Sequence, residues 1–497
     1  MSRRIVVVGA GPGGLTAAML LAARGYEVEI LEKAPDVGGR NAALRVGDYT
    51  FDTGPTFLMM KFILDEVFAQ TGRKTADFLD IYDLDPMYRL KFDDRFLDTT
   101  TDRGRMREQL AGLFPGEEAG FERFMAVEGK RFETLYPCLQ KHYSTPWTAF
   151  RPPLLKAIPR LSLHRTVFSV LGDYFRSEKA RICFTFQTKY LGMSPWDCPG
   201  AFGILPYTEY AFGIHHVIGG LSRISEVMAE IVRTDGGEVK LSTPVSRILV
   251  EKGRAVGVEL AGGERVPADE VVINADFGHA MTSLFAPGAL KKYTPARLDR
   301  MKLSCSTFML YLGLDKVYDL PHHTIAFAKD YRRNLNDIFK RMELPQDPSI
   351  YVRNAVVTDP GLAPAGKSAV YVLVPVPNTR ARLDWDRERG WFRDRVLETL
   401  INRVGMKDLD RHIEAEHVIA PPDWESQYSV YRGATFNLAH TLDQMLFRRP
   451  GNRFEEVRNC WLVGGGTHPG SGLPTIYESA RISARMICEA NGLKDAS

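Results

Sequence analysis

A glycine-rich turn between two apolar segments near the start of the chain constrains the fold more than any other feature. Residues 5–8 form a continuous run of β-branched side chains, typical of a strand buried on both faces of a parallel sheet. Gly9, Gly11 and Gly14 follow in the spacing GxGxxG, and apolar residues then recur at helical spacing until Gly25. The pattern predicts a strand, a tight turn and a helix whose N-terminus faces a phosphate group.

A second strand and an acidic residue complete the pattern of a dinucleotide site. Residues 28–31 predict a strand that ends at Glu32, where a carboxylate accepts hydrogen bonds from a ribose and disfavours the ribose phosphate of NADP. Gly38 and Gly39 admit a second approach of backbone to a phosphate, and Arg40 adds a cationic fork, which favours FAD over NAD. The alternative is a glycine-rich turn in an unrelated sheet.

This fingerprint, followed by Gly-Gly-Arg, resembles the large FAD-binding family that includes amine oxidases, protoporphyrinogen oxidases and carotenoid desaturases. The resemblance implies FAD, with the adenosine near Glu32, the pyrophosphate between the first turn and Arg40, and the backbone of Val245 against adenine. Residues 46–57, VGDYTFDTGPTF, are similar to a family segment that lies beside the flavin. The residues expected around FAD are Gly9, Ala10, Gly11, Pro12, Gly13, Gly14, Glu32, Lys33, Gly39, Arg40, Gly54, Pro55, Thr56, Val245, Gly465, Gly466, Gly472, Leu473 and Pro474.

Length and composition agree with a globular protein of two or three domains. The chain has 497 residues, of which 44% are hydrophobic and 25% charged, and its net charge of +3 is too small to indicate a nucleic-acid partner. Six scattered cysteines lack metal-ligand spacing, so we expect no metal site and reduced core thiols in a cytoplasmic protein. Residues 5–23 are uncharged, but the phosphate turn explains them better than a membrane span does.

We expect an α/β fold in which a Rossmann-type FAD-binding domain is interleaved with an α+β substrate domain. The FAD-binding domain is assigned to residues 1–75, 213–285 and 436–497, and the substrate domain to residues 286–435. Residues 76–212 are assigned to a helical, membrane-associating insertion, and the helical pattern extends from about residue 62 to 136. Short strands between residues 239 and 274 predict a β-rich unit that packs on the adenosine.

Residues 134–172 depart from the mixed charge of the rest of the chain. They contain no Asp or Glu, but Arg151, Lys156, Arg160 and Arg165 alternate with large apolar side chains. This composition predicts a segment at the surface of the cytoplasmic leaflet, built of short helices because prolines interrupt it. The alternative is a solvated basic face over ordinary core. Aromatic residues between 181 and 212 predict either an apolar tunnel or the core of a helical subdomain.

Strand patterns between residues 303 and 378 belong to segments that resemble a smaller group within the FAD-binding family. Residues 368–376 are apolar on both alternating faces, so we expect a covered sheet with one face over a hydrophobic ligand and the helix at 385–404 on the other. Residues 303–327, 347–378 and 434–474 are similar to bacterial-type phytoene desaturases and to relatives that act on diapophytoene. The resemblance implies an FAD-dependent desaturase of a long apolar polyisoprenoid, and it places the start of a helix near Pro474 against the flavin ring.

Desaturation removes two hydrogens from adjacent carbons that carry no acidic proton. Hydride transfer to FAD followed by proton loss to a weak base or water is the expected route. The nominated base is Glu478, and the alternative is a carboxylate that only complements the helix dipole. Asp52 is a weaker candidate, His468 is either a polar lining residue or a turn residue, and the pair His322-His323 is expected to be structural.

Four other functions share this scaffold or its fold. An amine oxidase requires a polar path to the flavin and commonly paired aromatic residues. A terminal-methyl oxygenase or an isomerase uses the same carotenoid scaffold. A prenyl-lipid carrier similar to the GDP-dissociation inhibitors binds no flavin and has no redox activity. The electron acceptor, oxygen or a quinone, and the oligomeric state are left open by the sequence.

Overall fold

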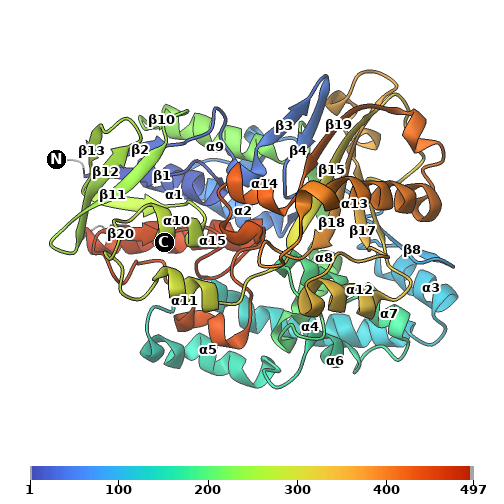
Figure 1. The fold of residues 1–497 in the computed structure, drawn as a ribbon. Coiled ribbons are helices and arrows are strands. Elements are labelled where there is room, and N and C mark those ends of the chain that lie inside the picture. Colours follow the sequence, from blue (N-terminus) through green and yellow to red (C-terminus); the bar gives the residue numbers. More distant parts are fainter. Residues whose placement is uncertain (1–2, 493–497) are drawn as a thin grey trace.

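A five-stranded parallel sheet carries the glycine-rich turn. The computed structural model describes residues 3–492, and its strand order in this sheet is β10–β2–β1–β14–β20 (Figure 1). The strands are β1 (Arg4–Val8), β2 (Glu27–Leu31), β10 (Glu238–Lys240), β14 (Glu270–Ile273) and β20 (Cys460–Leu462). They come from all three segments assigned to the FAD-binding domain. Of the strands predicted between residues 239 and 274, the first and the last, β10 and β14, pair with β2 and β1 in this sheet.

The two faces of this sheet are covered by different structures. Ile5 and Val7 pack against the helices α1 (Pro12–Ala22), α9 (Ser222–Thr234) and α15 (Leu473–Ala490). Val6 and Val8 pack against an antiparallel sheet made of β11 (Val245–Glu251), β12 (Arg254–Leu260) and β13 (Arg265–Pro267). The continuous β-branched run is therefore buried on both sides, as its sequence predicts.

A seven-stranded, mainly antiparallel sheet forms the second layer. Its order is β19–β15–β18–β17–β16–β7–β8. The strands are β7 (Arg89–Lys91), β8 (Phe96–Asp98), β15 (Ser306–Leu314), β16 (His323–Ala326), β17 (Ile350–Asn354), β18 (Ser368–Val376) and β19 (Ile413–Ile419). β7 and β8 correct the helical prediction for residues 62–136. These three-residue strands lie at the edge of the sheet and include charged residues, so their sequence does not distinguish them from a solvated helix. They are strands because β7 pairs with β16 and β8 pairs with β7.

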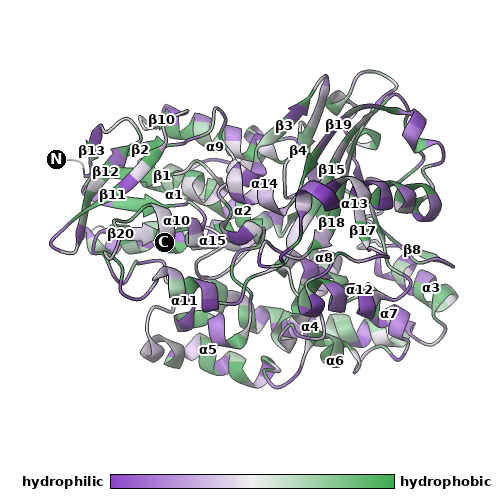
Figure 2. Cartoon of the chain, in the orientation of Figure 1, coloured by the Kyte–Doolittle hydropathy of each residue, from purple (hydrophilic) through white to green (hydrophobic). Residues whose placement is uncertain are grey.

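The alternation in β18 separates the two faces of this sheet as predicted. Val370 and Val372 pack on the helix α13 (Trp385–Thr399), whereas Ala369 and Tyr371 face the interior of the molecule. Figure 2 shows the difference in hydropathy, since the central strands are hydrophobic while α13 is mostly hydrophilic and buries one side only.

Helices of the segment 76–212 form a third layer, at the bottom of Figure 1. Residues 146–171 fold into short helices, as predicted for this segment, whereas residues 134–139 are the end of a long helix that begins at Glu118. None of the helices described for residues 3–492 is both long enough and apolar enough to span a membrane. The helices not yet named are α2 (Lys61–Ala69), α3 (Arg103–Leu113), α4 (Glu118–Leu139), α5 (Pro152–Ala157), α6 (Val167–Leu171), α7 (Glu178–Cys183), α8 (Ile204–Phe212), α10 (Phe277–Ser283), α11 (Pro295–Arg300), α12 (Tyr331–Asn336) and α14 (Pro421–Ser426).

Two small sheets complete the fold. β3 (Ala43–Val46) and β4 (Tyr49–Asp52) form a hairpin, and β9 (Ile214–Val217) pairs with both β5 (Leu58–Met59) and β6 (Ile81–Asp83).

Candidate active site

A cavity of about 570 Å³ opens at the carboxyl ends of the parallel strands and continues under the seven-stranded sheet. The last residues of β1, β2, β14 and β20, namely Val8, Leu31, Ile273 and Leu462, all line it. This edge is where ligands bind in open parallel sheets, because the strands and the following turns end there. Of the residues expected around FAD, all but Ala10 and Gly14 line this cavity.

The first turn leaves room for a phosphate only because it is made of glycine. A Cβ at Gly13 would lie 2.7 Å from Asn274 Oδ1, and a Cβ at Gly14 would overlap the carbonyl oxygen of Gly9. Gly14 therefore lets α1 pack on β1, which is the role predicted for it. The N-terminus of α1 points its free N–H groups into the cavity beside Gly11, which is a favourable place for an anion.

Glu32 is fixed at the end of β2 by two backbone donors. The N–H of Ala10 donates to Oε2 at 2.7 Å, and the N–H of Ala34 donates to Oε1 at 2.9 Å. Each carboxylate oxygen keeps a further acceptor site, which is what recognition of a ribose requires. Lys33 donates to Ser429 Oγ at 2.6 Å, and this bond closes the same end of the cavity.

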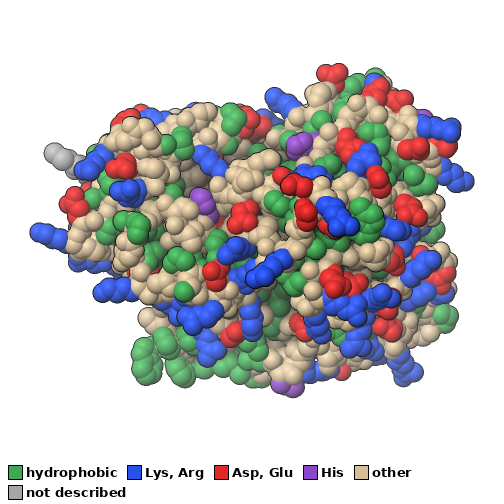
Figure 3. Space-filling view, viewed as in Figure 1, with side chains coloured by type: hydrophobic (Ala, Val, Ile, Leu, Met, Phe, Trp, Pro, Cys, Tyr) green, Lys and Arg blue, Asp and Glu red, His purple; other side chains and the backbone are tan. Residues whose placement is uncertain are grey.

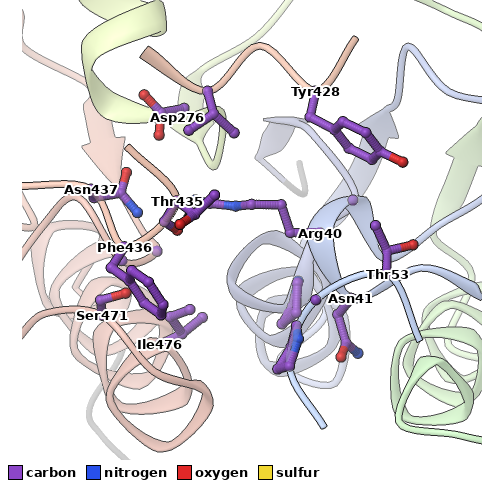
Figure 4. Close-up of a pocket in the computed structure, with 18 of the residues that line it drawn as sticks. Arg40, Asn41, Thr53, Asp276, Tyr428, Thr435, Phe436, Asn437, Ser471 and Ile476 are labelled. Atoms are coloured by element: carbon purple, nitrogen blue, oxygen red, sulfur yellow. Dashed lines mark hydrogen bonds between the residues drawn. The ribbon is translucent and has the colours of Figure 1, made fainter. Parts of the chain in front are cut away.

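Arg40 joins the N-terminal segment to a loop almost four hundred residues later in the chain. Its guanidinium donates to the carbonyl of Thr435 at 2.7 Å and lies beside Asp276, which faces it from the end of β14 (Figure 4). Burial raises the pKa of Asp276, and the charge on Arg40 opposes this shift only in part. The hydroxyl of Thr435 is buried and has no hydrogen-bond partner among the described residues, although it lines the cavity. The guanidinium of Arg40 and the hydroxyl of Thr435 therefore offer polar contacts that the protein itself does not use fully.

Beyond Arg40 the walls come from two glycine-containing segments. Gly466 is packed so closely that a Cβ would lie 2.5 Å from Phe277, and α15 begins at Gly472, whose φ is 109°. On the opposite wall, Tyr371 donates to the carbonyl of Gly54 at 2.8 Å and so fixes the segment that ends at Thr56. A planar ring system fits between such walls, because neither wall projects a side chain at its glycines.

The far arm of the cavity is apolar and aromatic. Its lining includes Phe57, Met59, Phe186, Ile325 and Leu373. The aromatic segment 181–212 contributes only Phe186 and Tyr190 to the cavity, and most of its other aromatic residues are core, so the tunnel prediction holds for two residues. The cavity thus joins a polar, glycine-lined end to a hydrophobic end.

Comparison with known proteins agrees with a cavity that has a polar, glycine-lined end and a hydrophobic end. The profile of the family described as flavin containing amine oxidoreductase matches residues 12–488. A 4,4'-diapophytoene desaturase (4,4'-diapolycopene-forming) from Methylomonas sp is 53% identical over 493 residues, covering 99% of this chain and 96% of the relative. An all-trans-zeta-carotene desaturase from Myxococcus xanthus is 39% identical, covering 99% and 94%. The chain belongs to the carotenoid desaturases of the flavin-containing amine oxidoreductase family.

The fold is shared much more widely than the sequence. An oxidoreductase from Methanosarcina mazei superposes with a TM-score of 0.64 at 18% identity, covering 98% of this chain and 100% of the other. The carotenoid desaturase is thus an oxidoreductase with FAD as its cofactor, and the cavity fits that group. The observations behind the fit are the glycine cradle, the free donors of α1 and the unused hydroxyl of Thr435.

The nomination of Glu478 as the base is corrected by its position. Leu473, Pro474 and Ile476 of α15 line the cavity, but Glu478 does not. A helix turns about 100° per residue, so a side chain two residues after Ile476 points to the opposite side. There Glu478 pairs with Arg481 at 2.6 Å, and burial raises its pKa.

The other candidate bases are also structural. Asp52 is buried in an ion pair with Arg353 at 2.9 Å and does not line the cavity. His468 is a buried turn residue whose Nε2 lies 2.9 Å from the carbonyl of Lys141, and burial lowers its pKa to about 4. The described residues contain no cluster of side chains that would hold a metal ion.

Three residues of the carotenoid desaturase were not found by sequence reasoning. Lys189 lines the apolar arm, and its ammonium makes no ion pair or hydrogen bond with any residue of the described part of the chain, so burial lowers its pKa to about 7. Asn274 lies under the first turn, and Tyr351 lines the apolar arm from β17. Asn274 was visible only as part of an Asn-Ala-Asp turn, and Tyr351 only as one aromatic residue in a strand.

Proposed function

We propose that this chain is an FAD-dependent desaturase of a linear carotenoid precursor of the diapophytoene or phytoene type. The observation that carries the proposal is the continuity of the cavity, in which a dinucleotide cradle opens directly into an apolar arm. Relatives named as desaturases of diapophytoene and zeta-carotene support the substrate class, and the 53% identity to the first of them favours diapophytoene.

In this proposal Glu32 and Val245 would hold the adenosine of FAD, and Gly11 and Arg40 would hold its pyrophosphate. The segment 54–56 and the start of α15 would hold the flavin ring. When bound, FAD supplies an acceptor for the hydride that leaves the substrate. The N-terminus of α15 directs partial positive charge at the ring, where it stabilises negative charge.

The protein contributes orientation and dryness to this reaction. Phe57, Ile325 and Leu373 hold an apolar chain by dispersion and by exclusion of water, and no charged side chain pairs with it. A carbon without an acidic proton reacts only when it is held close to the acceptor. The aromatic and aliphatic side chains of the apolar arm favour a hydrocarbon over an amine, which argues against the amine oxidase alternative. The flavin-containing family argues against a carrier without redox activity.

An anaerobic assay in liposomes tests the proposal. The FAD-loaded protein is mixed with phytoene or with diapophytoene, and flavin bleaching and the product spectrum are recorded. We expect diapophytoene to bleach the flavin and to form a longer conjugated chain. If neither hydrocarbon bleaches it, but a conjugated carotenoid is oxidised at its terminal methyl groups in air, the protein is an oxygenase instead; cis-to-trans conversion without bleaching would identify an isomerase.

The substrate dissolves only in lipid, and we propose that residues 147–163 bind the surface of the cytoplasmic leaflet. Trp147 is 81% exposed and Phe150 64%, and three further apolar side chains of this segment are also exposed: Leu155, Ile158 and Leu163. Figure 3 shows hydrophobic side chains gathered on the lower left edge, around α5. Lys156 and Arg160 are exposed in the same segment, where they can meet anionic headgroups.

Sedimentation with vesicles tests the membrane proposal. Replacing Trp147, Phe150 and Ile158 by Ser should release the protein from anionic vesicles, and replacing Lys156 and Arg160 by Glu should weaken binding in proportion to the anionic lipid. Arg165 is a poorer choice because it pairs with Asp173 at 2.6 Å. A matched control replaces two exposed aromatic residues elsewhere, Phe78 and Tyr82, by Ser. Equal sedimentation of all variants would exclude this surface.

A further inference from the structure

A chain of hydrogen bonds leads from the apolar arm of the cavity into the buried interior. The hydroxyl of Tyr351, which lines the cavity, lies 2.7 Å from Thr56 Oγ1 and 2.8 Å from His323 Nδ1. His323 is fully buried at the start of β16, and its Nε2 has no hydrogen-bond partner among residues 3–492. An imidazole therefore stands one hydrogen bond behind the wall that faces the substrate.

The charged groups near His323 form a closed set of their own. Arg353 pairs with Asp52 at 2.9 Å and donates hydrogen bonds to His322 Nε2 and to His216 Nδ1. Both rings therefore accept with one nitrogen and carry their proton on the other. None of these bonds reaches His323.

The outer nitrogens of those two rings are also occupied. His216 Nε2 lies 3.0 Å from Asp359 Oδ2, and His322 Nδ1 lies 2.9 Å from Thr358 Oγ1. Burial, and to a smaller extent Arg353 and His216, hold the pKa of His323 well below its usual range. The His323 ring is consequently neutral at neutral pH, with Nδ1 free to accept the hydroxyl proton of Tyr351.

The proposed desaturation creates a need for such a group. After one hydrogen has left with its electron pair, the remaining carbon skeleton is positively charged, and a neighbouring C–H must release a proton to complete the double bond. Such a cation is a strong acid, so a neutral oxygen acceptor is basic enough if it is well placed. The apolar arm offers few oxygen atoms, and the hydroxyl of Tyr351 is one that lies within hydrogen-bond distance of a buried imidazole.

We propose that Tyr351 accepts this proton on its hydroxyl oxygen while its own proton passes to His323 Nδ1. The C–H bond breaks and its electron pair becomes the second bond of the new double bond. An O–H bond forms on Tyr351, the old O–H bond breaks, and the imidazole becomes cationic for that turnover. When the product leaves and water enters the cavity, the imidazolium passes its proton back through Tyr351 to that water, which its low basicity favours. Tyr351 is the catalytic residue, and His323 is a positioning residue that acts through it. The inference rests on the proposed desaturase function.

Two other buried groups are less suitable. Burial raises the pKa of Glu209 to about 7, but Glu209 does not line the cavity. Tyr190 lines the cavity, and burial together with the charge of Glu209 raises the pKa of its hydroxyl, but its geometry toward Glu209 is not that of a hydrogen bond. The ammonium of Lys189 lies 4.9 Å from the centroid of the Tyr331 ring, which is not part of the cavity wall, so its stem rather than its nitrogen faces the substrate.

The test compares single turnovers of flavin-loaded Tyr351→Phe and His323→Gln with the wild type, in H₂O and D₂O. In the wild type we expect product formation to show a solvent isotope effect. In Tyr351→Phe the product should form about 100-fold more slowly, without the isotope effect, or with double bonds at wrong positions. In His323→Gln the slow rate should rise with pH, because hydroxide then replaces the ring. Carotenoid binding, measured by quenching of protein fluorescence, should be unchanged in both.

Tyr371→Phe is the matched control, since it removes a hydroxyl from the neighbouring strand that donates to a backbone carbonyl instead of a histidine. Whatever its rate, it should keep the wild-type isotope effect and pH profile. A Tyr351→Phe variant with the wild-type rate and isotope effect would overturn the proposal, and so would a Tyr371→Phe variant that loses the isotope effect. If Tyr351→Phe binds no flavin, His323→Gln decides the matter alone through its pH profile. Failure of the wild type to desaturate any hydrocarbon would instead refute the proposed function.

Discussion

The two ends of the cavity are built by different means. The dinucleotide end uses backbone N–H groups, glycines and one carboxylate, and most of its parts lie within thirty-five residues of each other in the sequence. The apolar end is assembled from side chains of segments as distant as Phe57, Phe186, Tyr351 and Leu373. A local backbone motif can be read from its spacing, whereas a wall made of distant side chains depends on the tertiary fold.

The largest change in stability should come from the buried ion pair behind the wall of the apolar end. Replacing Arg353 by Met leaves the Asp52 carboxylate buried without its partner, which should cost about 3–5 kcal/mol of folding free energy. Chemical denaturation measures the change. The double variant Arg353→Met, Asp52→Leu removes both charges and should recover most of the loss. If the single variant is as stable as the double variant, this ion pair does not support the cavity wall.

A smaller loss of stability, together with loss of FAD, should follow Gly14→Ala at the dinucleotide end. The added Cβ overlaps the carbonyl oxygen of Gly9, so the turn must open, at a cost of about 3 kcal/mol. The visible flavin absorbance of the purified variant measures retention of the cofactor. Gly112→Ala in α3 is the control, because its Cβ meets no atom within 4 Å and alanine favours a helix. Retention of full flavin by Gly14→Ala would contradict the close packing of α1 on β1.

Lys189 offers a test of how dry the protein interior beside the apolar end is. Burial lowers its pKa from 10.5 to about 7, so between these pH values the unfolded chain binds a proton that the folded protein does not. Stability should therefore rise with pH from about 7 to 10.5, by at most about 1.4 kcal/mol per pH unit. Lys189→Met should remove this slope and stabilise the protein by about 1–3 kcal/mol at pH 6. Denaturation curves over this pH range measure both effects, and Lys74→Met, at an exposed lysine outside the cavity, serves as control. An unchanged slope would mean that water reaches the ammonium.

The sequence predicted the fold where residues obey a local rule. The run 5–8, the glycine turn and the alternation of Ala369 and Tyr371 against Val370 and Val372 each follow from a period or a steric requirement. The strands β7 and β8 were missed because three residues do not establish a period, and the pairing of β7 with β16 is non-local. The His322-His323 pair was interpreted as structural, since the sequence shows neither Tyr351 beside one ring nor Arg353 beside the other.

The smallest effect is expected for Glu478, where proximity in sequence to the flavin motif was misleading. Glu478→Gln should leave turnover within about twofold and cost about 1 kcal/mol of stability, because the amide keeps a hydrogen bond to Arg481 and Arg481 keeps its ion pair with Glu66. A steady-state assay beside Tyr351→Phe makes the comparison direct. Glu478 follows the cavity-lining Ile476 by two positions, and two positions on a helix are about half a turn. A large fall in turnover for Glu478→Gln with normal flavin content would mean that the helix rotates when the substrate binds.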